Sequence, residues 1–348
     1  MGEAAPIGAV GIGAIALTAI YWIFGFLRMG TAGLTAQAIG AGRKGEVAAL
    51  FSRGMIIALA AGFMIIALQM PFMWLAMKTA PASDEVESLA RSYMGIRIYG
   101  APAAIGIYVA SGWLIGQGRT RALLLIQLWM NGLNIALDLW FVLGLGWGVE
   151  GVAIATLIAE WSGLALGCWM CRDALNTPAW KDWPRVFERS AMVNFATVNR
   201  DILLRSVMLQ GIFMSFIFLG ARYGDVTLAA NHVLLQFLEI TAYAMDGFAI
   251  AAETLVGQSL GARSLSHVRR AAVLTSFWGG VSAIITASAF MLFGPAIIDI
   301  MTTSPDVRIE ARAYLPYMIA APIMGCAAWM LDGIFIGATR SGDMRNMM

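Results

Sequence analysis

The sequence predicts an all-α polytopic membrane protein made of two pseudo-symmetric helical bundles. Composition is the first reason: 59% of the residues are apolar and 13% are charged, whereas a soluble domain is roughly 45–50% apolar and about 25% charged. The second reason is that the apolar stretches are long and are interrupted mainly by short basic loops. A backbone in lipid must satisfy its own hydrogen bonds, so these stretches favour helices. The third reason is an internal repeat.

Nine apolar segments are each long enough, as helices, to cross a hydrocarbon core of about 30 Å. They lie at 7–38, 46–78, 86–117, 120–144, 149–172, 191–221, 226–258, 266–299 and 307–338. The stretch after the fifth segment holds Pro178 and Pro184 among basic residues, and we expect a cytoplasmic linker there at 176–190. This linker would join an amino-terminal lobe at 1–175 to a carboxy-terminal lobe at 191–348.

Fifteen residues recur in the second half of the chain at a constant offset of 221, without a gap across 87 positions. The first copies are Gln37, Gly40, Ala41, Val47, Met70, Phe72, Ser83, Val86, Ala90, Arg91, Tyr93, Gly112, Ile115, Gly116 and Arg119. The identity is low, so the clustering and the missing gaps carry the argument for a duplication. A duplicated half built from apolar helices is typical of secondary transporters.

The repeat also predicts helices that this chain does not hold. The segment 191–221 precedes the second copy, and its counterpart would lie before Met1. The segments 120–144 and 149–172 follow the first copy, and their counterparts would lie beyond Met348. We therefore expect six helices per half and twelve in all, of which nine are present. An even number per half gives both halves the same orientation, related by an axis along the membrane normal.

Basic residues are divided unequally between the two sets of alternate loops, with 14 in one set and 5 in the other. Cytoplasmic loops carry the excess of Lys and Arg. The richer set is therefore expected in the cytoplasm, which places Met1 outside the cell and Met348 inside.

A carboxylate with polar neighbours lies at membrane depth in the fourth and fifth segments. Asn134 and Asp138 are four residues apart and share one helix face, and Thr156 follows on the next helix at a comparable depth. An ionisable group at this depth faces a bundle interior or a water-filled path by default. A carboxylate with amide and hydroxyl neighbours can take up H⁺ or Na⁺. The alternative is a buried strut held by hydrogen bonds.

Other charged groups in the apolar segments suggest a gate. Arg28 maps by the repeat to position 249, between Asp246 and Glu253, and we expect a salt bridge or gate between the lobes; separate pairing within each lobe is the alternative. Asp201 and Arg205 are also four residues apart and favour a local ion pair.

Several binding classes are excluded by spacing. The run from Gly146 to Gly151 fits G-x-G-x-x-G but follows no strand, so we reject a dinucleotide site, and no P-loop motif occurs. Cys168 and Cys171 have no second pair, so we expect neither a zinc nor a redox site. The basic residues are dispersed, which argues against nucleic-acid binding.

An enzyme embedded in the membrane would need a catalytic constellation in one compact segment. His232 and His267 are 35 residues apart, on different helices or loops. We therefore expect no enzymatic activity and no cofactor, and no metal beyond Na⁺ at Asn134, Asp138 and Thr156.

These segments resemble the multidrug and toxic compound extrusion (MATE) family. The segment from Asn134 through Asp138 and Thr156 is similar to the fifth and sixth helices of that family. Three further stretches resemble the bacterial DNA-damage-inducible F branch of this family. They are Asn199-Arg200-Asp201-Ile202 with Arg205, Asp246-Gly247-Phe248-Ala249 with Glu253 and Gln258, and the run from Leu331-Asp332-Gly333 to Arg340.

The resemblance implies two six-helix bundles around a cavity that opens alternately to either side. It implies an antiporter of the bacterial inner membrane that exports small organic, often cationic, compounds in exchange for H⁺ or Na⁺, and a monomer. Asn134, Asp138 and Thr156 would form the ion site with Tyr93 as a neighbour, and Asp332 matches a carboxylate that some branches use in the other lobe. The sequence leaves one further transport function open, a flippase for lipid-linked saccharides, because of the intramembrane arginines Arg28, Arg97, Arg200 and Arg205.

Overall fold

Helices make up the structure, and residues 4–79 and 82–347, which the computed structural model describes, form no β-strand. Eight helical segments in this part of the chain are long and apolar enough to cross a membrane. They are Ala5–Gly40, Lys44–Ala67, Asp84–Gly116, Thr120–Gly144, Gly148–Met170, Asp225–Gly261, Leu265–Met301 and Pro305–Gly337. The remaining predicted segment, 191–221, is helix α11 (Arg189–Gly220), which is not among those eight. The fold class is confirmed, with a count of eight spans in the described part where nine were predicted.

The chain divides into two compact units. The first unit comprises residues 1–35 and 43–203, and the second comprises residues 36–42 and 204–348. Helices of the first unit are α1 (Ala4–Ile23), most of α2 (Phe26–Gly40), α3 (Lys44–Ala67), α4 (Gln69–Thr79), α5 (Asp84–Arg97), α6 (Ala101–Gly116), α7 (Thr120–Asp138), α8 (Gly148–Met170), α9 (Arg172–Leu175) and α10 (Trp183–Val186). The second unit holds α12 (Asp225–Gly261), α13 (Leu265–Met301), α14 (Pro305–Gly337) and α15 (Ser341–Met347), and α11 passes from one unit to the other.

Three predicted spans of the first unit are broken where the sequence predicts continuous helices. Phe24 and Gly25 separate α1 from α2, and Leu68 separates α3 from α4. Pro71 explains the second break, because its ring excludes the carbonyl of the residue four positions earlier. A 3₁₀ turn, η1 (Ile98–Gly100), separates α5 from α6, and Pro102 follows it without an N–H to give to the Ile98 carbonyl.

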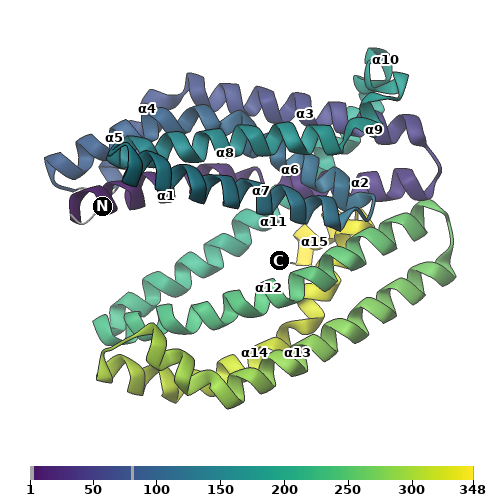
Figure 1. The fold of residues 1–348 in the computed structure, drawn as a ribbon. Coiled ribbons are helices and arrows are strands. Elements are labelled where there is room, and N and C mark those ends of the chain that lie inside the picture. The colour runs from purple at the N-terminus through teal and green to yellow at the C-terminus, as the bar shows by residue number, and fades with distance from the viewer. Residues whose placement is uncertain (1–3, 80–81, 348) are drawn as a thin grey trace. The chain divides into compact units, whose positions relative to one another are not determined.

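The core of the first unit forms where α3, α6 and the α7–α8 pair pack together (Figure 1). The Trp113 indole of α6 stacks edge-on against Phe51 of α3, with 5.5 Å between ring centroids, and donates to the Val47 carbonyl at 2.8 Å. The predicted linker folds against the same helix α3. There the Arg53 side chain, which is 1% exposed, donates to the carbonyls of Val186 and Arg185 at 2.9 and 3.1 Å. These are the last carbonyls of α10, so one buried cation holds the end of the linker.

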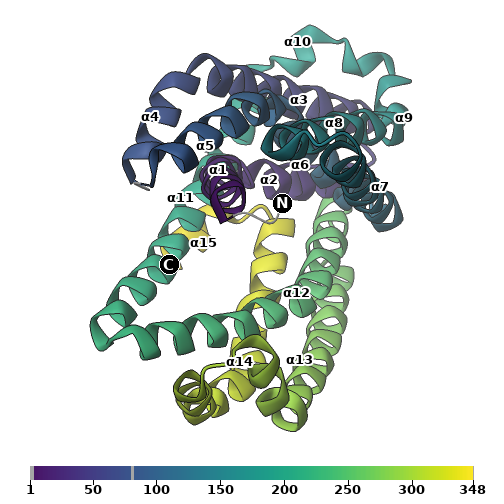
Figure 2. The same ribbon diagram turned by 60° about the vertical axis from the view of Figure 1, so that its left-hand side comes forward.

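In the second unit, α12, α13 and α14 pack along one another, as the green to yellow ribbons show (Figure 2). Phe237 of α12 and Phe290 of α13 meet edge-on at 4.9 Å, and Leu315 of α14 joins the same buried cluster. These helices expose many large apolar side chains on their outer faces. Such faces suit a lipid environment, in which they need no further protein cover.

Helix boundaries repeat at the offset of 221 that the sequence shows. The pairs are Gly40 and Gly261 as helix ends, Lys44 and Leu265 as starts, Asp84 and Pro305 as starts, Gly116 and Gly337 as ends, and Thr120 and Ser341 as starts. Turn geometry repeats as well. The backbone is left-handed at Gly42 (φ 68°) and at its counterpart Arg263 (φ 55°). The low sequence identity therefore reflects a duplicated structure.

Close helix contacts repeat in the same register. A side chain at Gly112 would collide with the Arg28 carbonyl of α2, and one at Gly333 would collide with the carbonyl of Ala249, the counterpart of Arg28. Gly112 therefore marks a close contact between helices. Within the second unit, which includes the last turn of α2, Gly40 faces the Gln258 backbone and Gly261 faces the Gln37 backbone. Replacing both residues of the Gly40–Gln258 contact by their counterparts gives the Gly261–Gln37 contact, which is the contact pattern of a local two-fold axis.

Candidate functional site

The candidate ion site is built on the α7–α8 pair. Asn134 of α7 donates from its amide to the Thr156 hydroxyl of α8 at 3.1 Å, and that hydroxyl donates to the Val152 carbonyl at 2.9 Å. The structure thus brings together two of the predicted residues from different helices. The bond therefore sets the register between α7 and α8, because it holds Asn134 beside Thr156.

Asp138 is the last residue of α7, one turn beyond Asn134. Its Oδ1 is buried and has no hydrogen-bond partner among the residues that the structure describes. A π-helical turn, η2 (Leu139–Gly144), begins directly after it, and such wide turns are frequent at functional sites. A buried carboxylate oxygen without a donor is costly as an anion. It is therefore suited to a proton or a cation.

Tyr93 is placed less directly. It lies on α5, which packs against α8, and it is 4% exposed beside Gly13 of α1. No hydrogen bond between Tyr93 and Asn134, Asp138 or Thr156 occurs in the described chain. Its membership of the ion site stays a prediction.

A buried ion pair joins α5 to α8 in the same unit. Arg97 donates from both terminal nitrogens to the Glu160 carboxylate at 2.7 and 2.9 Å, and both side chains are about one-tenth exposed. Gly100 leaves room for this carboxylate, because a side chain there would collide with it. The Tyr21 hydroxyl of α1 donates to the Arg97 carbonyl at 3.2 Å. Three helices are therefore tied to the 3₁₀ turn that follows Arg97.

Arg97 and Glu160 lie in two different apolar segments of the sequence, and nothing in the sequence pairs them. The available signal was their opposite charge on two apolar segments. The register between the segments, which decides whether the charges meet, comes from packing.

In the second unit, Arg205 of α11 forms an ion pair with Asp332 of α14. The neighbouring Arg200 pairs with Asp201, at 3.0 Å between Nη2 and Oδ1. The predicted local pairing of Asp201 with Arg205 is not tested by these contacts and stays a prediction. Asp332, predicted only from the resemblance, thus has a cationic partner in this unit.

The predicted gate residues belong to different units. Arg28 lies in the first unit, and its Nη1 is buried without a hydrogen-bond partner in the described ranges. Asp246 is exposed and Glu253 is 2% exposed, both on α12 of the second unit. Pairing of Arg28 with either carboxylate stays a prediction.

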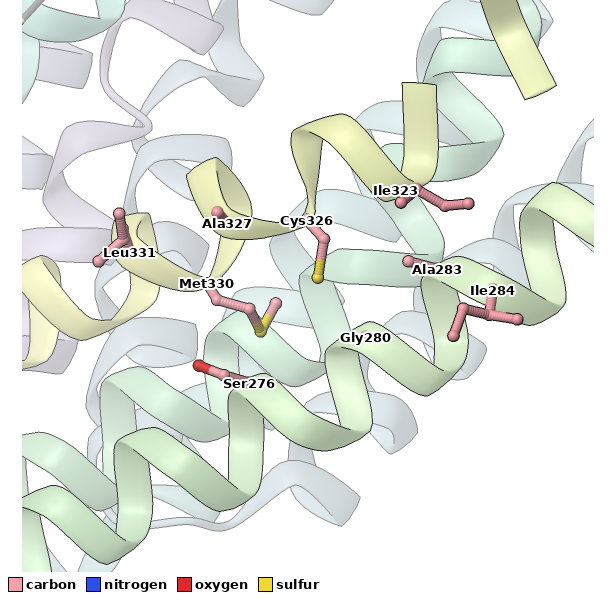
Figure 3. A pocket seen from close by; sticks show the side chains of 9 residues that line it. All are labelled: Ser276, Gly280, Ala283, Ile284, Ile323, Cys326, Ala327, Met330 and Leu331. Carbon is pink, nitrogen blue, oxygen red and sulfur yellow. The ribbon is translucent and has the colours of Figure 1, made fainter. Parts of the chain in front are cut away.

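An apolar groove of about 530 Å³ lies between α13 and α14 in the second unit. Figure 3 shows Ile323, Cys326 and Met330 of α14 facing Ser276 and Ile284 of α13 across it. At the counterpart positions in the first unit, α8 fills the space; Leu164 of α8 covers Gly106, the counterpart of Ala327. The groove has no charged lining residue and offers van der Waals contact only.

Comparison with known proteins bears on this arrangement. The MatE family profile matches residues 3–140 and 202–344. The chain is 39% identical over 346 residues to DNA damage-inducible protein F of Escherichia coli, which covers 98% of this chain and 75% of that protein. It is 25% identical over 325 residues to a probable multidrug resistance protein NorM of Neisseria meningitidis, with 89% and 69% coverage. It is also 23% identical over 265 residues to human multidrug and toxin extrusion protein 1, with 73% and 45% coverage.

Solved structures show the same fold. A crystal structure described as MATE in the bent conformation aligns with a TM-score of 0.88 at 20% identity, over 99% of this chain and 77% of that one. A multidrug resistance MATE family transporter in an outward-facing conformation aligns with a TM-score of 0.81 at 20% identity and the same coverage.

Proposed function

This chain belongs to the MATE family of multidrug and toxin extrusion transporters, and from that premise we propose that it is an antiporter that exports small organic cations in exchange for H⁺ or Na⁺. The proposal is carried by the buried Oδ1 of Asp138, which lacks a donor beside the Asn134–Thr156 hydrogen bond. No other cofactor is required in this proposal.

The ion would act by changing the charge of Asp138. A proton neutralises the carboxylate, and Na⁺ would take oxygen ligands from Asp138, Asn134 and Thr156, since hard cations prefer oxygen. Either ion shifts the balance between access states only by its difference in affinity for them. A tenfold difference in affinity corresponds to about 1.4 kcal/mol. Tyr93 of the neighbouring α5 is a further candidate for this site.

Charges of both units are candidates for the opening and closing step. We assign a gating role to Arg28 with Asp246 and Glu253, and a second role to the Arg205–Asp332 pair with Asp201. Buried charged pairs are expensive to break. If these charged side chains exchange partners during transport, each set of pairs would therefore stabilise one of the two access states.

The chain is a multi-pass membrane protein, because eight described segments meet the requirements for crossing a bilayer. We propose the bacterial inner membrane as its location, Met1 outside, and a monomer as its working form. The names of the relatives reported above do not point to the flippase alternative: one is called a DNA damage-inducible protein, one a probable multidrug resistance protein and one a multidrug and toxin extrusion protein.

Flux of a fluorescent organic cation in proteoliposomes tests the proposal. The full chain should move the cation under a pH gradient or a Na⁺ gradient, and Asp138→Asn should abolish the coupled flux. Asp306→Asn is the matched control, because that exposed carboxylate lies in the first turn of α14. Thr156→Val removes the acceptor for Asn134 and should lower coupled flux roughly two- to tenfold, the effect of one hydrogen bond, while Thr156→Ser retains it. Flux that is independent of both gradients, or intact in Asp138→Asn, contradicts the proposal.

A further inference from the structure

A basic cavity lies at the opposite end of α7 from the candidate ion site. The turn between α6 and α7 and the end of α8 enclose about 490 Å³, lined by Arg119, Arg121, Arg172, Trp169 and Leu125 among others. Arg121 precedes Asp138 by 17 residues on α7, a separation of about 25 Å along a helix. The cavity is therefore distinct from the transport residues.

The cavity carries more positive than negative charge. Arg119 pairs with Asp173 at 3.0 Å. Arg172 lies over the Trp169 ring, 4.4 Å from its centroid, and donates to the Trp169 carbonyl at 3.2 Å. Arg121 is exposed and forms no ion pair or hydrogen bond with any residue that the structure describes. Three guanidinium groups thus share one carboxylate, and Arg121 and Arg172 have no ion pair within the described residues.

Backbone geometry holds these groups in place. Gly118 adopts a left-handed conformation (φ 73°), and the Arg119 amide bonds the Leu114 carbonyl at 2.9 Å, which ends α6. Helix α7 then starts at Thr120 without a side-chain cap. Its first amides add a partial positive charge to that of the arginines.

Apolar surface borders the charged groups. Trp169 is 57% exposed and Leu125 is 52% exposed, and Leu128 continues the exposed face one turn along α7. A small soluble anion would make no contact with this apolar surface. An amphiphile would, because its charged group can lie among the arginines while its chain follows α7.

We propose that this cavity binds the headgroup of an anionic phospholipid. Arg121 and Arg172 bind the phosphate oxygens, since the guanidinium fork matches phosphate geometry. Trp169 lies at the level of the interface, where tryptophan is enriched, and Leu125 and Leu128 contact an acyl chain. Basic pockets between transmembrane helices are known places for such headgroups.

The repeat supplies a matched control. Arg340 is the counterpart of Arg119, but Gly342 stands at the position that corresponds to Arg121, and Asp343 lies 3.5 Å from Arg340. The second copy thus has an exposed arginine beside a carboxylate and no arginine at the position of Arg121.

Native mass spectrometry of the purified full chain with an equal mixture of dioleoyl phosphatidylglycerol and dioleoyl phosphatidylcholine tests the proposal. Phosphatidylglycerol should bind preferentially. Arg121→Gln should weaken its binding roughly fivefold and Arg121→Gln/Arg172→Gln roughly 25-fold, whereas Arg340→Gln should leave it unchanged. Millimolar inorganic phosphate should not displace the lipid.

Three results would overturn the proposal: equal binding of the two lipids, an Arg340→Gln loss equal to that of Arg121→Gln, or displacement by inorganic phosphate, which would indicate a site for soluble anions. Unchanged gel-filtration behaviour and thermal unfolding of each variant show that the fold is kept. Because no transport is measured, the result does not depend on the proposed antiport.

Discussion

Individual charged residues of the first unit are handled in two different ways. Arg97 donates from its two terminal nitrogens to both carboxylate oxygens of Glu160, so this carboxylate is not available for an exchangeable ion, although the Arg97 Nε is buried without an acceptor among the described residues. Asp138 has one buried oxygen without a donor in the described structure. A paired charge at membrane depth holds two helices in one register, whereas a carboxylate oxygen without a donor can bind a proton or a cation. This contrast is the reason for assigning structure to the first pair and ion coupling to Asp138.

The Arg97–Glu160 pair gives a prediction at the scale of single residues. Glu160→Leu leaves a buried guanidinium without its partner and should lower the free energy of unfolding by about 3–5 kcal/mol. The counterpart of Arg97 in the second copy is Met318. The double variant Arg97→Met/Glu160→Leu should therefore recover most of the loss, as measured by unfolding in mixed detergent and dodecyl sulfate.

The control for this cycle is Arg97→Met alone, which should also be destabilising because it leaves Glu160 unpaired. Purely additive effects of the two single substitutions would show that the pair contributes no coupling energy.

Sequence alone reached part of the site at this scale. Asn134, Asp138 and Thr156 could be grouped because four-residue spacing and equal depth follow from the sequence, and the structure brings Asn134 and Thr156 together through one hydrogen bond. The partner of Arg97 could not be derived, because it depends on how far α5 slides along α8. That register is set by close contacts such as the one at Gly100.

At the scale of helices, small residues decide where backbones can meet. Gly40 and Gly261 each lie against the backbone of the opposite helix in the second unit, with no room for a methyl group. Gly247, on the same helix α12, has nothing within 4 Å of the position that a side chain would take. One helix therefore carries a glycine needed for packing and a glycine that is not.

This difference predicts opposite effects for the same substitution. Gly261→Ala should destabilise the protein by about 1–3 kcal/mol, because α2 and α12 must move apart. Gly247→Ala should stabilise it by up to about 1 kcal/mol, the difference in helix propensity. The same unfolding titration measures both, and a loss of similar size in the two variants would contradict the assigned contact.

The helices themselves were largely predictable, and their breaks were not. Apolar windows gave nine segments, and eight of them correspond to observed spans, because lipid demands length and hydrophobicity. The ends agree within three residues except for the second segment, which was predicted to end at 78 and ends at Ala67. The interruptions at Leu68 and at Ile98–Gly100 lie inside such windows. Pro71 and Pro102 lie close to these interruptions. The sequence alone does not show whether a proline lies in the first turn of a new helix or inside a continuous one, so it did not locate the breaks.

At the scale of the whole molecule, the duplication leaves the two copies unequally equipped. Boundaries and turns repeat from Gly40 to Thr120 and from Gly261 to Ser341. The first copy is followed by the α7–α8 pair, which carries the candidate ion site and covers the helices before it. The corresponding face between α13 and α14 is an open groove.

Basic turns predict the orientation of all the spans at once. The turns after α2, α6 and α12 carry Arg43, Arg119 and Arg263. With α11 counted as a crossing, as the sequence predicts for 191–221, helix order places all three at the same membrane face. In a background without the native cysteines, Ala82→Cys should react with an impermeant maleimide from outside intact spheroplasts, and Ser266→Cys only after lysis. Both positions are exposed, so equal labelling in detergent is the control. The reverse order of labelling would place the arginine-rich turns at the outer face, and the proposed phospholipid cavity with them. It would also contradict the orientation with Met348 in the cytoplasm, which was predicted from the positive-inside rule.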